Sequence, residues 1–166
     1  MQRVIHAPDI AKQLGSLATG NLMRPNGYGR RFASKLKIDQ SIVDELFSRF
    51  GLVWEMEEPE LGHFIGNNYL MGAHVHVHTD PAPVGFHHVR CNVAIEMPKF
   101  GGKPVLDGVE LDVKEGDVWI CFSSIEEHSS TPIKNGDRVV VSMASLIEKH
   151  IAESAYGKLA PKISAT

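Results

Sequence analysis

The repeat of apolar residues changes from a helical to a strand-like period after Gly51. A weak helical repeat follows Asp9, and a clearer one follows Asp39 after a loop-like stretch rich in Gly, Pro and Asn. The apolar stripe of this second helix comprises Ile42, Val43, Leu46, Phe47 and Phe50. Asp39 can cap its first turn, with Ile38 and Val43 as a hydrophobic staple, and Gly51 can end it. The sequence therefore predicts helices within residues 1–51.

From Leu52 onward, apolar and polar residues alternate in short segments that are separated by Pro, Gly, Asn and Asp. This pattern is typical of strands and turns. The expected strands occupy residues 52–57, 67–78, 87–97, 103–108, 109–113, 117–123 and 138–147. Their spacing favours a closed or sandwich-like architecture over a parallel α/β sheet. We therefore expect a mainly β fold, a small jelly roll with the N-terminal helices packed on it.

The length of 166 residues suits a single domain spanning residues 1–166. We expect a helical buttress in 1–51, a β core in 52–147, and a C-terminal helix and tail in 148–166. With 43% hydrophobic and 22% charged residues, the composition excludes wholesale disorder.

The charge, the apolar runs and the cysteine content indicate which partners and which cellular compartment to expect. Because the net charge is −3, with 17 Lys and Arg against 20 Asp and Glu, no nucleic-acid partner is expected. No apolar run approaches the roughly 20 residues that cross a bilayer, so no membrane partner is expected, and the N-terminus has no apolar core of signal-peptide length. Cys91 and Cys121 are too few for a disulfide framework; we expect both to be buried in a protein of the reducing cytoplasm.

Five of the nine histidines fall between His74 and His88. Strand alternation places His76, His78 and Asp80 on one face, with valines on the other. Three later segments have a similar polar face, which carries Arg90 and Asn92, Trp119 and Cys121, or Arg138 and Ser142. A sheet face in water is normally built from Lys, Glu and Thr rather than from imidazoles. The pattern therefore indicates the polar wall of a pocket.

His78 and Asp80 are two residues apart, about 6.6 Å along a strand, so both side chains can reach one ion. His128, just after a strong strand, is the candidate third ligand. Two imidazoles and one carboxylate form the facial triad of non-haem Fe(II) oxygenases, which leaves three coordination positions open. Zinc can use the same ligands with a water in the fourth position.

The order His78-Thr79-Asp80, His128 and Arg138 resembles the Fe(II)/2-oxoglutarate-dependent dioxygenases, whose pattern is H-x-D, a distal His, and then an Arg or Lys. The stretch GDVWICFSSIEEHSSTPIKNGDRVVVSM is similar to the family's segment around the distal His, and FGGKPVLDG resembles its Gly-Gly turn. The resemblance covers residues 69–146 and does not extend to the first fifty. It implies a double-stranded β-helix, the cupin-like form of the jelly roll.

The resemblance also implies the chemistry. Fe(II) would be held by His78, Asp80 and His128, and 2-oxoglutarate would chelate the iron while its far carboxylate rests on Arg138. Ser142 would add a hydrogen bond to this co-substrate, or is a core serine. Oxidative decarboxylation of 2-oxoglutarate would be coupled to hydroxylation of a small molecule or a peptide side chain. The carboxylate of Asp80 favours hydroxylation or desaturation, because family members that halogenate carry a small residue there.

The candidate substrate-binding residues are His76, Arg90, Asn92 and Trp119. The alternative roles are structural. His76 could make polar contacts inside the barrel, and Trp119 could pack in the core. The alternative for the arginine is a salt bridge with Glu96 or Asp107. His87 and His88 are expected on an exposed loop. We expect one basic stretch to be solvent-exposed surface; the alternative is a surface that attracts an acidic partner. It comprises Arg24, Arg30, Arg31, Lys35 and Lys37.

Two other functions remain open at this stage. One is a cupin-like metalloenzyme that does not use 2-oxoglutarate. The other is a non-catalytic jelly-roll module whose histidines bind structural zinc. Dependence of oxygen uptake on 2-oxoglutarate separates the first from an oxygenase, and metal analysis followed by a turnover assay separates the second.

Overall fold

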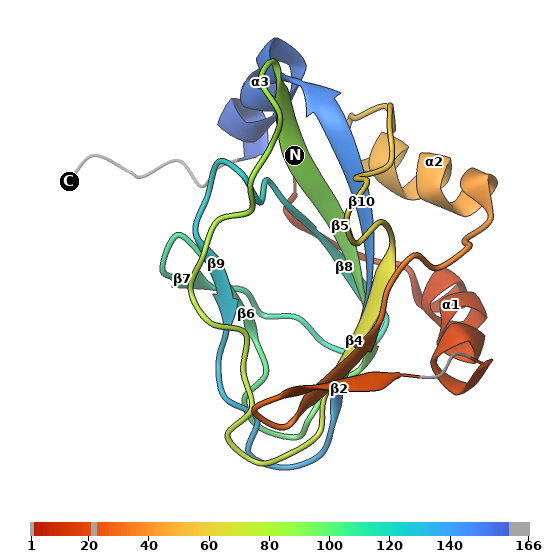
Figure 1. Cartoon of the computed structure of the whole chain (residues 1–166), viewed down its shortest axis with the longest axis vertical. Coiled ribbons are helices and arrows are strands. Elements are labelled where there is room, and N and C mark those ends of the chain that lie inside the picture. Colours follow the sequence, from red (N-terminus) through yellow and green to blue (C-terminus); the bar gives the residue numbers. More distant parts are fainter. Residues whose placement is uncertain (1, 21–22, 160–166) are drawn as a thin grey trace.

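The computed structural model describes residues 2–20 and 23–159, which form two antiparallel sheets (Figure 1). The larger sheet has seven strands in the order β1 (Val4–His6), β8 (Asp117–Cys121), β5 (Phe86–Glu96), β10 (Arg138–Glu148), β4 (Phe64–Asn68), β3 (Arg30–Ala33) and β2 (Arg24–Gly27). The smaller sheet has three, in the order β7 (Val109–Glu110), β6 (Pro104–Leu106) and β9 (His128–Ser130). The expected mainly β fold is confirmed.

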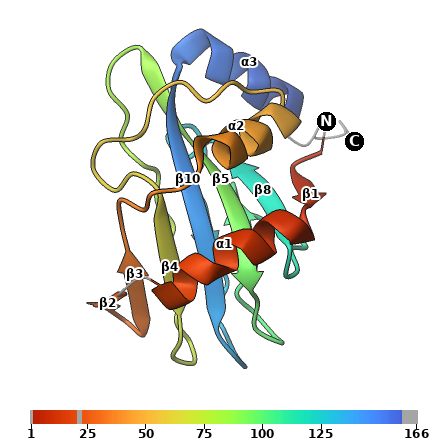
Figure 2. The same ribbon diagram turned by 90° about the vertical axis from the view of Figure 1, so that its right-hand side faces the viewer.

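Helices cover the face of the larger sheet that points away from the smaller one (Figures 1 and 2). They are α1 (Pro8–Gly20), α2 (Gln40–Arg49) and α3 (Lys149–Leu159). The main apolar core lies between these helices and the sheet, and includes Leu14, Phe47, Val93, Ile120, Val141 and Ala152. In the described part of the chain, no helix has both the length and the apolarity to cross a membrane. The expected C-terminal tail beyond residue 159 lies outside the described residues.

Helix α2 begins and ends where the sequence predicts. The Asp39 side chain accepts a hydrogen bond of 2.9 Å from the backbone N–H of Ser41, which caps the first turn. Gly51 follows the last turn with φ +73°, a conformation that glycine adopts without strain. Val43 is fully buried, and Ile38 packs against the same core.

Strand alternation divides the larger sheet into a core face and a pocket face. On β5, Val89, Cys91 and Val93 point into the core beneath the helices. Arg90 and Asn92, which alternate with them, line a cavity on the opposite face. The same division holds for β8 and β10, so the sequence pattern predicted both faces correctly.

Two of the expected strands are wrong. Residues 52–57 form only an isolated bridge, between Met56 and Leu146. The segment 67–78 is not one strand, because β4 ends at Asn68 and the chain turns through Gly72, which has φ +88°. Beyond the turn the chain runs beside β9 as an irregular extension of the smaller sheet, with a bridge between His78 and His128.

The described part of residues 1–51 contains three short strands besides the two expected helices. β1 pairs with β8 at one edge of the larger sheet, and β2 and β3 form a hairpin at the other edge. The sequence pattern did not indicate these strands, which have three or four residues each. The N-terminal segment therefore completes the sheet as well as covering it.

Candidate metal centre

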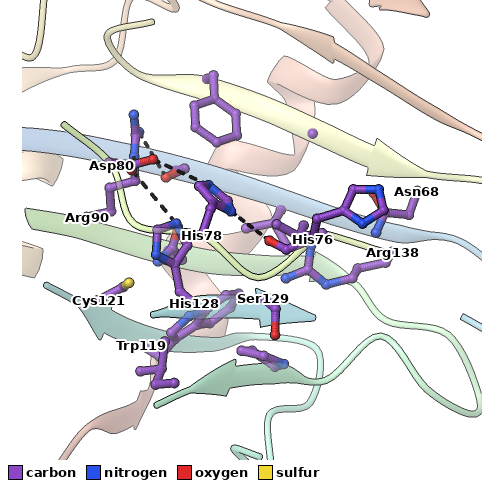
Figure 3. A pocket seen from close by; sticks show the side chains of 18 of the residues that line it. Asn68, His76, His78, Asp80, Arg90, Trp119, Cys121, His128, Ser129 and Arg138 are labelled. Carbon is purple, nitrogen blue, oxygen red and sulfur yellow. Dashed lines mark hydrogen bonds and ion pairs between the residues drawn. The ribbon is translucent and has the colours of Figure 1, made fainter. Parts of the chain in front are cut away.

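A cavity of about 380 Å³ lies between the two sheets, a size typical of small-molecule sites. Alternate residues of the larger sheet form one wall, and residues of β6 and β9 line the other (Figure 3). The site residues predicted from the sequence that line it are His76, His78, Asp80, Arg90, Asn92, Trp119, His128, Arg138 and Ser142. The structure therefore brings all of them to one cavity.

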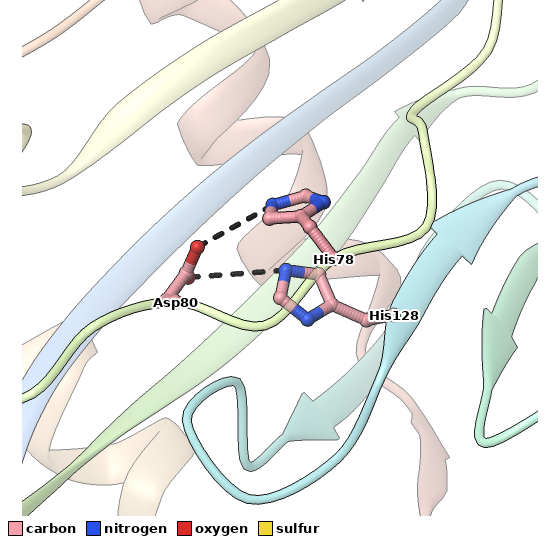
Figure 4. Close-up of side chains that lie close together, drawn as sticks. All are labelled: His78, Asp80 and His128. Carbon is pink, nitrogen blue, oxygen red and sulfur yellow. Dashed lines mark ion pairs between the residues drawn. The ribbon is translucent and has the colours of Figure 1, made fainter.

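His78, Asp80 and His128 each offer one ligand atom, and these atoms lie within 4.8 Å of one another. The Nε2 atoms of His78 and His128 lie 3.4 Å and 3.8 Å from the two carboxylate oxygens of Asp80 (Figure 4). The backbone fixes this arrangement. His78 and His128 exchange two backbone hydrogen bonds, of 3.2 Å and 2.9 Å, and the Asp80 N–H donates to the Ser123 carbonyl at 2.7 Å.

The outer ring nitrogens orient both imidazoles for metal binding. Nδ1 of His78 donates to the His76 carbonyl at 2.6 Å, and Nδ1 of His128 donates to the Glu126 carbonyl at 3.4 Å. Because a carbonyl only accepts, each neutral ring carries its proton on Nδ1 and presents the lone pair of Nε2 to the cavity. Two imidazole nitrogens and one carboxylate therefore converge, a donor set that fits Fe(II).

The charge states of the triad also suit a divalent metal. Burial alone would raise the pKa of Asp80, but the hydrogen bond with His78 and the charge of Arg90 hold that pKa well below its usual range. Burial lowers the pKa of His128, which favours the neutral form of this ring. The hydrogen bond with Asp80 raises the pKa of His78, so a metal would compete with a proton there.

Arg90 lies behind the triad and is buried among acidic groups. Its Nε is 3.4 Å from Asp80 Oδ2, and its Nη2 is 3.9 Å from Glu58 Oε2. The expectation of a salt bridge with Glu96 or Asp107 is therefore wrong in its partners. Those two acids lie at the far end of β5 and in the β6–β7 turn, whereas a loop far away in the sequence brings Glu58 to the guanidinium.

Arg138 lies at the other end of the cavity, beside Asn68 (Figure 3). It is 8% exposed, and its Nε donates to the Gly102 carbonyl at 2.8 Å. No carboxylate of the described residues lies within ion-pair distance of this guanidinium. Burial and the neighbouring charge of Arg30 lower the pKa of Arg138 to about 10. A buried, cationic fork without an acidic partner fits a carboxylate ligand such as that of 2-oxoglutarate.

His87 and His88 correct another prediction, because both lie on strand β5 rather than on an exposed loop. His88 is 3% exposed, and its Nε2 is buried without a hydrogen-bond partner in the described part of the chain. Burial lowers its pKa to about 4, so the ring is neutral. His87 is half-buried and pairs with Glu153 at 3.2 Å. Strand pairing with β10 reaches Phe86, which the turn-like Gly-Phe sequence did not indicate.

Sequence reasoning missed other polar residues near the site. Arg30 and Asn68 line the cavity, and Glu58 stands behind Arg90. Arg30 belongs to the basic stretch for which the sequence predicts solvated surface, and for this residue the prediction is wrong. Only the pairing of β3 with β4 turns its side chain toward the cavity. His74 is not among the residues that line this cavity, and the centroid of its ring lies 4.5 Å from that of His76.

No protein-family model matches the chain, and no curated protein sequence does. Solved structures do match. An oxidoreductase of the 2OG-Fe(II) oxygenase family from Burkholderia pseudomallei has a TM-score of 0.64 at 14% identity, covering 86% of this chain and 82% of its own. The viral collagen prolyl hydroxylase from Paramecium Bursaria Chlorella virus-1, solved with 2OG, has a TM-score of 0.61 at 13% identity, covering 88% and 95%.

A prolyl hydroxylase from Trichoplax adhaerens, in complex with a peptide of hypoxia inducible factor, has a TM-score of 0.61 at 14% identity and covers 91% of this chain and 85% of its own. The chain therefore has the jelly-roll fold of the 2-oxoglutarate/Fe(II) oxygenases. The fold that the resemblance implied is confirmed, and a His-Asp-His group lies in its cavity.

Proposed function

We propose that the protein is an Fe(II)- and 2-oxoglutarate-dependent oxygenase that hydroxylates a small molecule or a peptide side chain. One observation carries the proposal. The two imidazoles and the carboxylate of a facial triad share a cavity with the buried guanidinium of Arg138, which has no acidic partner among the described residues. Neither a structural zinc site nor a metalloenzyme that does not use 2-oxoglutarate gives a reason to bury the unpaired guanidinium of Arg138.

In this proposal His78, Asp80 and His128 hold the metal and leave three positions open. Bound Fe(II) and 2-oxoglutarate supply the oxidative chemistry, in which O₂ gives one atom to succinate and one to the substrate, and CO₂ is released. Arg138 holds the far carboxylate of 2-oxoglutarate through its fork. Ser142 accepts a hydrogen bond of 3.3 Å from Arg90, which leaves its own hydroxyl proton free to donate to the co-substrate.

Asp80 bears on the reaction type. Its carboxylate occupies a coordination position and is kept anionic by its neighbours, so it leaves no place for a halide. The proposal is therefore hydroxylation rather than halogenation. The side chains of Asp80 and His128 are 19% and 15% exposed, whereas that of His78 is 45% exposed, so the triad is accessible mainly through His78.

The test is 2-oxoglutarate binding to the Mn(II)-loaded protein by calorimetry without oxygen, together with Fe(II)-dependent succinate formation in air. We expect Arg138→Lys to weaken 2-oxoglutarate binding by about 1–3 kcal/mol, because the charge stays but the bidentate geometry is lost. Arg24→Lys, an exposed arginine of β2, is the matched control and should have no effect. Unchanged affinity in Arg138→Lys would contradict the assignment.

A further inference from the structure

Arg30, Asn68 and Arg138 form a row across three neighbouring strands. Asn68 of β4 is the register partner of Arg138 on β10 and of Arg30 on β3. Side chains that are directly opposite in a sheet point to the same face, and adjacent strands are about 4.8 Å apart. All three residues line the cavity. A second guanidinium therefore reaches the candidate site, two strands away from Arg138.

The contacts of Arg30 leave its charge without an acidic partner. Its Nε donates to Asn68 Oδ1 at 3.1 Å, and this is a neutral acceptor. No ion pair joins Arg30 to an acid within residues 2–20 and 23–159. Burial lowers its pKa, and its charge in turn acts on Arg138 and on His78. Two cations thus face one cavity, and the folded protein alone does not neutralise either of them.

One guanidinium fork matches one carboxylate. In the proposed function, the near carboxylate of 2-oxoglutarate goes to the metal and its far carboxylate goes to Arg138, so this co-substrate has no third anionic group for Arg30. An unpaired, partly buried cation in a ligand cavity marks a position for an anion. The remaining anion must therefore come from the other substrate.

The surroundings of Arg30 place it on the open side of the cavity. It lies on the β2–β3 hairpin, whose turn residue Tyr28 is 84% exposed and packs edge-on against His76 at 5.7 Å. On the neighbouring strand Gly66 also lines the cavity and presents no side chain to it. Arg30 and the triad line the same cavity, and the charge of Arg30 acts on His78, so an acid held by Arg30 can extend toward the metal within this cavity.

We propose that Arg30 binds a carboxylate of the primary substrate, which is therefore a small organic acid or a free amino acid rather than a neutral molecule. This inference rests on the proposed function. It makes Arg30 a substrate-binding residue that selects for charge at the entrance, while Arg138 serves the co-substrate.

The experiment uses the full chain loaded with Mn(II) and saturating 2-oxoglutarate, without oxygen. L-amino acids and simple monocarboxylates, each paired with its primary amide, are titrated into wild type, Arg30→Gln and Arg30→Lys by calorimetry. We expect at least one acid to bind wild type more tightly than its amide, and Arg30→Gln to weaken that acid about ten- to a hundredfold. Arg30→Lys should retain part of the preference. Arg24→Gln, on the same hairpin but exposed, should behave as wild type.

Affinity for 2-oxoglutarate is measured separately on each variant and should fall far less in Arg30→Gln than in Arg138→Lys, because only the more distant charge is lost. A loss there comparable to that of Arg138→Lys would assign Arg30 to the co-substrate and overturn the inference. Equal binding of every acid and its amide to wild type would also overturn it. Failure of wild type to bind 2-oxoglutarate at all would instead overturn the proposed function, and the inference with it.

Discussion

Arg90 is the cation that contacts the buried acidic side chains behind the candidate metal centre. Its side chain, 6% exposed, lies within ion-pair distance of Asp80 and Glu58 and stacks over the ring of Phe64 at 4.8 Å. Its Nη1 also donates to Ser142. These contacts favour the structural alternative for Arg90 over the substrate-binding role that its strand face also allowed.

Replacing Arg90 therefore tests structure rather than substrate binding. Arg90→Met should lower the free energy of unfolding by about 3–5 kcal/mol, because two partly buried carboxylates lose their shared cation. Urea unfolding of the metal-free protein measures this. Asn92→Ala, on the same strand face but outside these ion pairs, is the control and should cost much less. Similar losses in both variants would mean that Arg90 acts only through its packing.

At the scale of elements, the carboxylate of Glu58 holds most of the loop that leads into β4. Glu58 accepts hydrogen bonds from the backbone N–H groups of Glu60, Leu61 and Gly62, at 2.8 Å, 2.9 Å and 3.2 Å. This resembles the capping of a helix start, in which one acidic side chain satisfies several free N–H groups. The loop in turn carries Leu61 to the rim of the cavity.

This contact predicts a pH dependence of stability. Burial alone would raise the pKa of Glu58, but the backbone hydrogen bonds outweigh it and lower that pKa below its ordinary 4.5. A carboxyl with a lowered folded-state pKa stabilises the fold above its unfolded-state pKa, and this contribution is lost as the pH falls. The stability difference between wild type and Glu58→Gln should therefore shrink between about pH 6 and about pH 3.

Unfolding by urea across this pH range measures the difference. Glu60→Gln is the matched control, because that side chain is exposed and Glu60 meets Glu58 only through its backbone. A difference that stays constant with pH would mean that Glu58 holds the loop equally well when protonated.

Long elements were predictable from the sequence, and short ones were not. β5 and β10 have eleven residues each, and their alternation identified Arg90 and Arg138 as cavity residues. β2 and β3 have four residues each; β2 contains Pro and Gly, and β3 begins with two arginines, so neither shows the alternation of a strand. Their conformation depends on the partner strand β4, which is a tertiary effect. Arg30 was missed for this reason.

The triad was predictable because its chemistry depends on residue type and order. His78 and Asp80 are neighbours in the sequence, and His128 follows a strong strand. What the sequence did not give was the backbone around them: His78 belongs to an irregular segment beside β9, not to a strand of the larger sheet. The role of Glu58 could not be predicted from the sequence either, because its contact with Arg90 joins segments far apart in the chain.

At the scale of the whole molecule, the hydrophobic core and the candidate metal centre lie on opposite faces of the larger sheet. Phe47 and the other core residues lie on the helix-covered face, and the triad lies on the cavity face. Truncations on the two faces should therefore have different consequences, which a pair of variants can separate.

Phe47→Ala should destabilise the protein by about 3–5 kcal/mol, because it leaves a cavity beneath α2. At temperatures where it is folded, its Mn(II) affinity should match wild type. His128→Ala should abolish tight Mn(II) binding and leave the melting temperature of the metal-free protein nearly unchanged. Calorimetric titration and thermal unfolding on the same samples give both quantities. Loss of metal affinity in Phe47→Ala would show that the two faces are coupled.

The two edge strands of the larger sheet also bear on whether copies of this chain aggregate through strand pairing. β1 offers three residues at one border, and β2 offers four at the other, including Pro25, which has no N–H to donate. Such short and interrupted borders are poor templates for an extended strand of another molecule. The longest strands, β5 and β10, are paired on both sides within the fold. The segments best suited to amyloid-like stacking are thus sequestered between β8 and β4 for as long as the sheet stays intact.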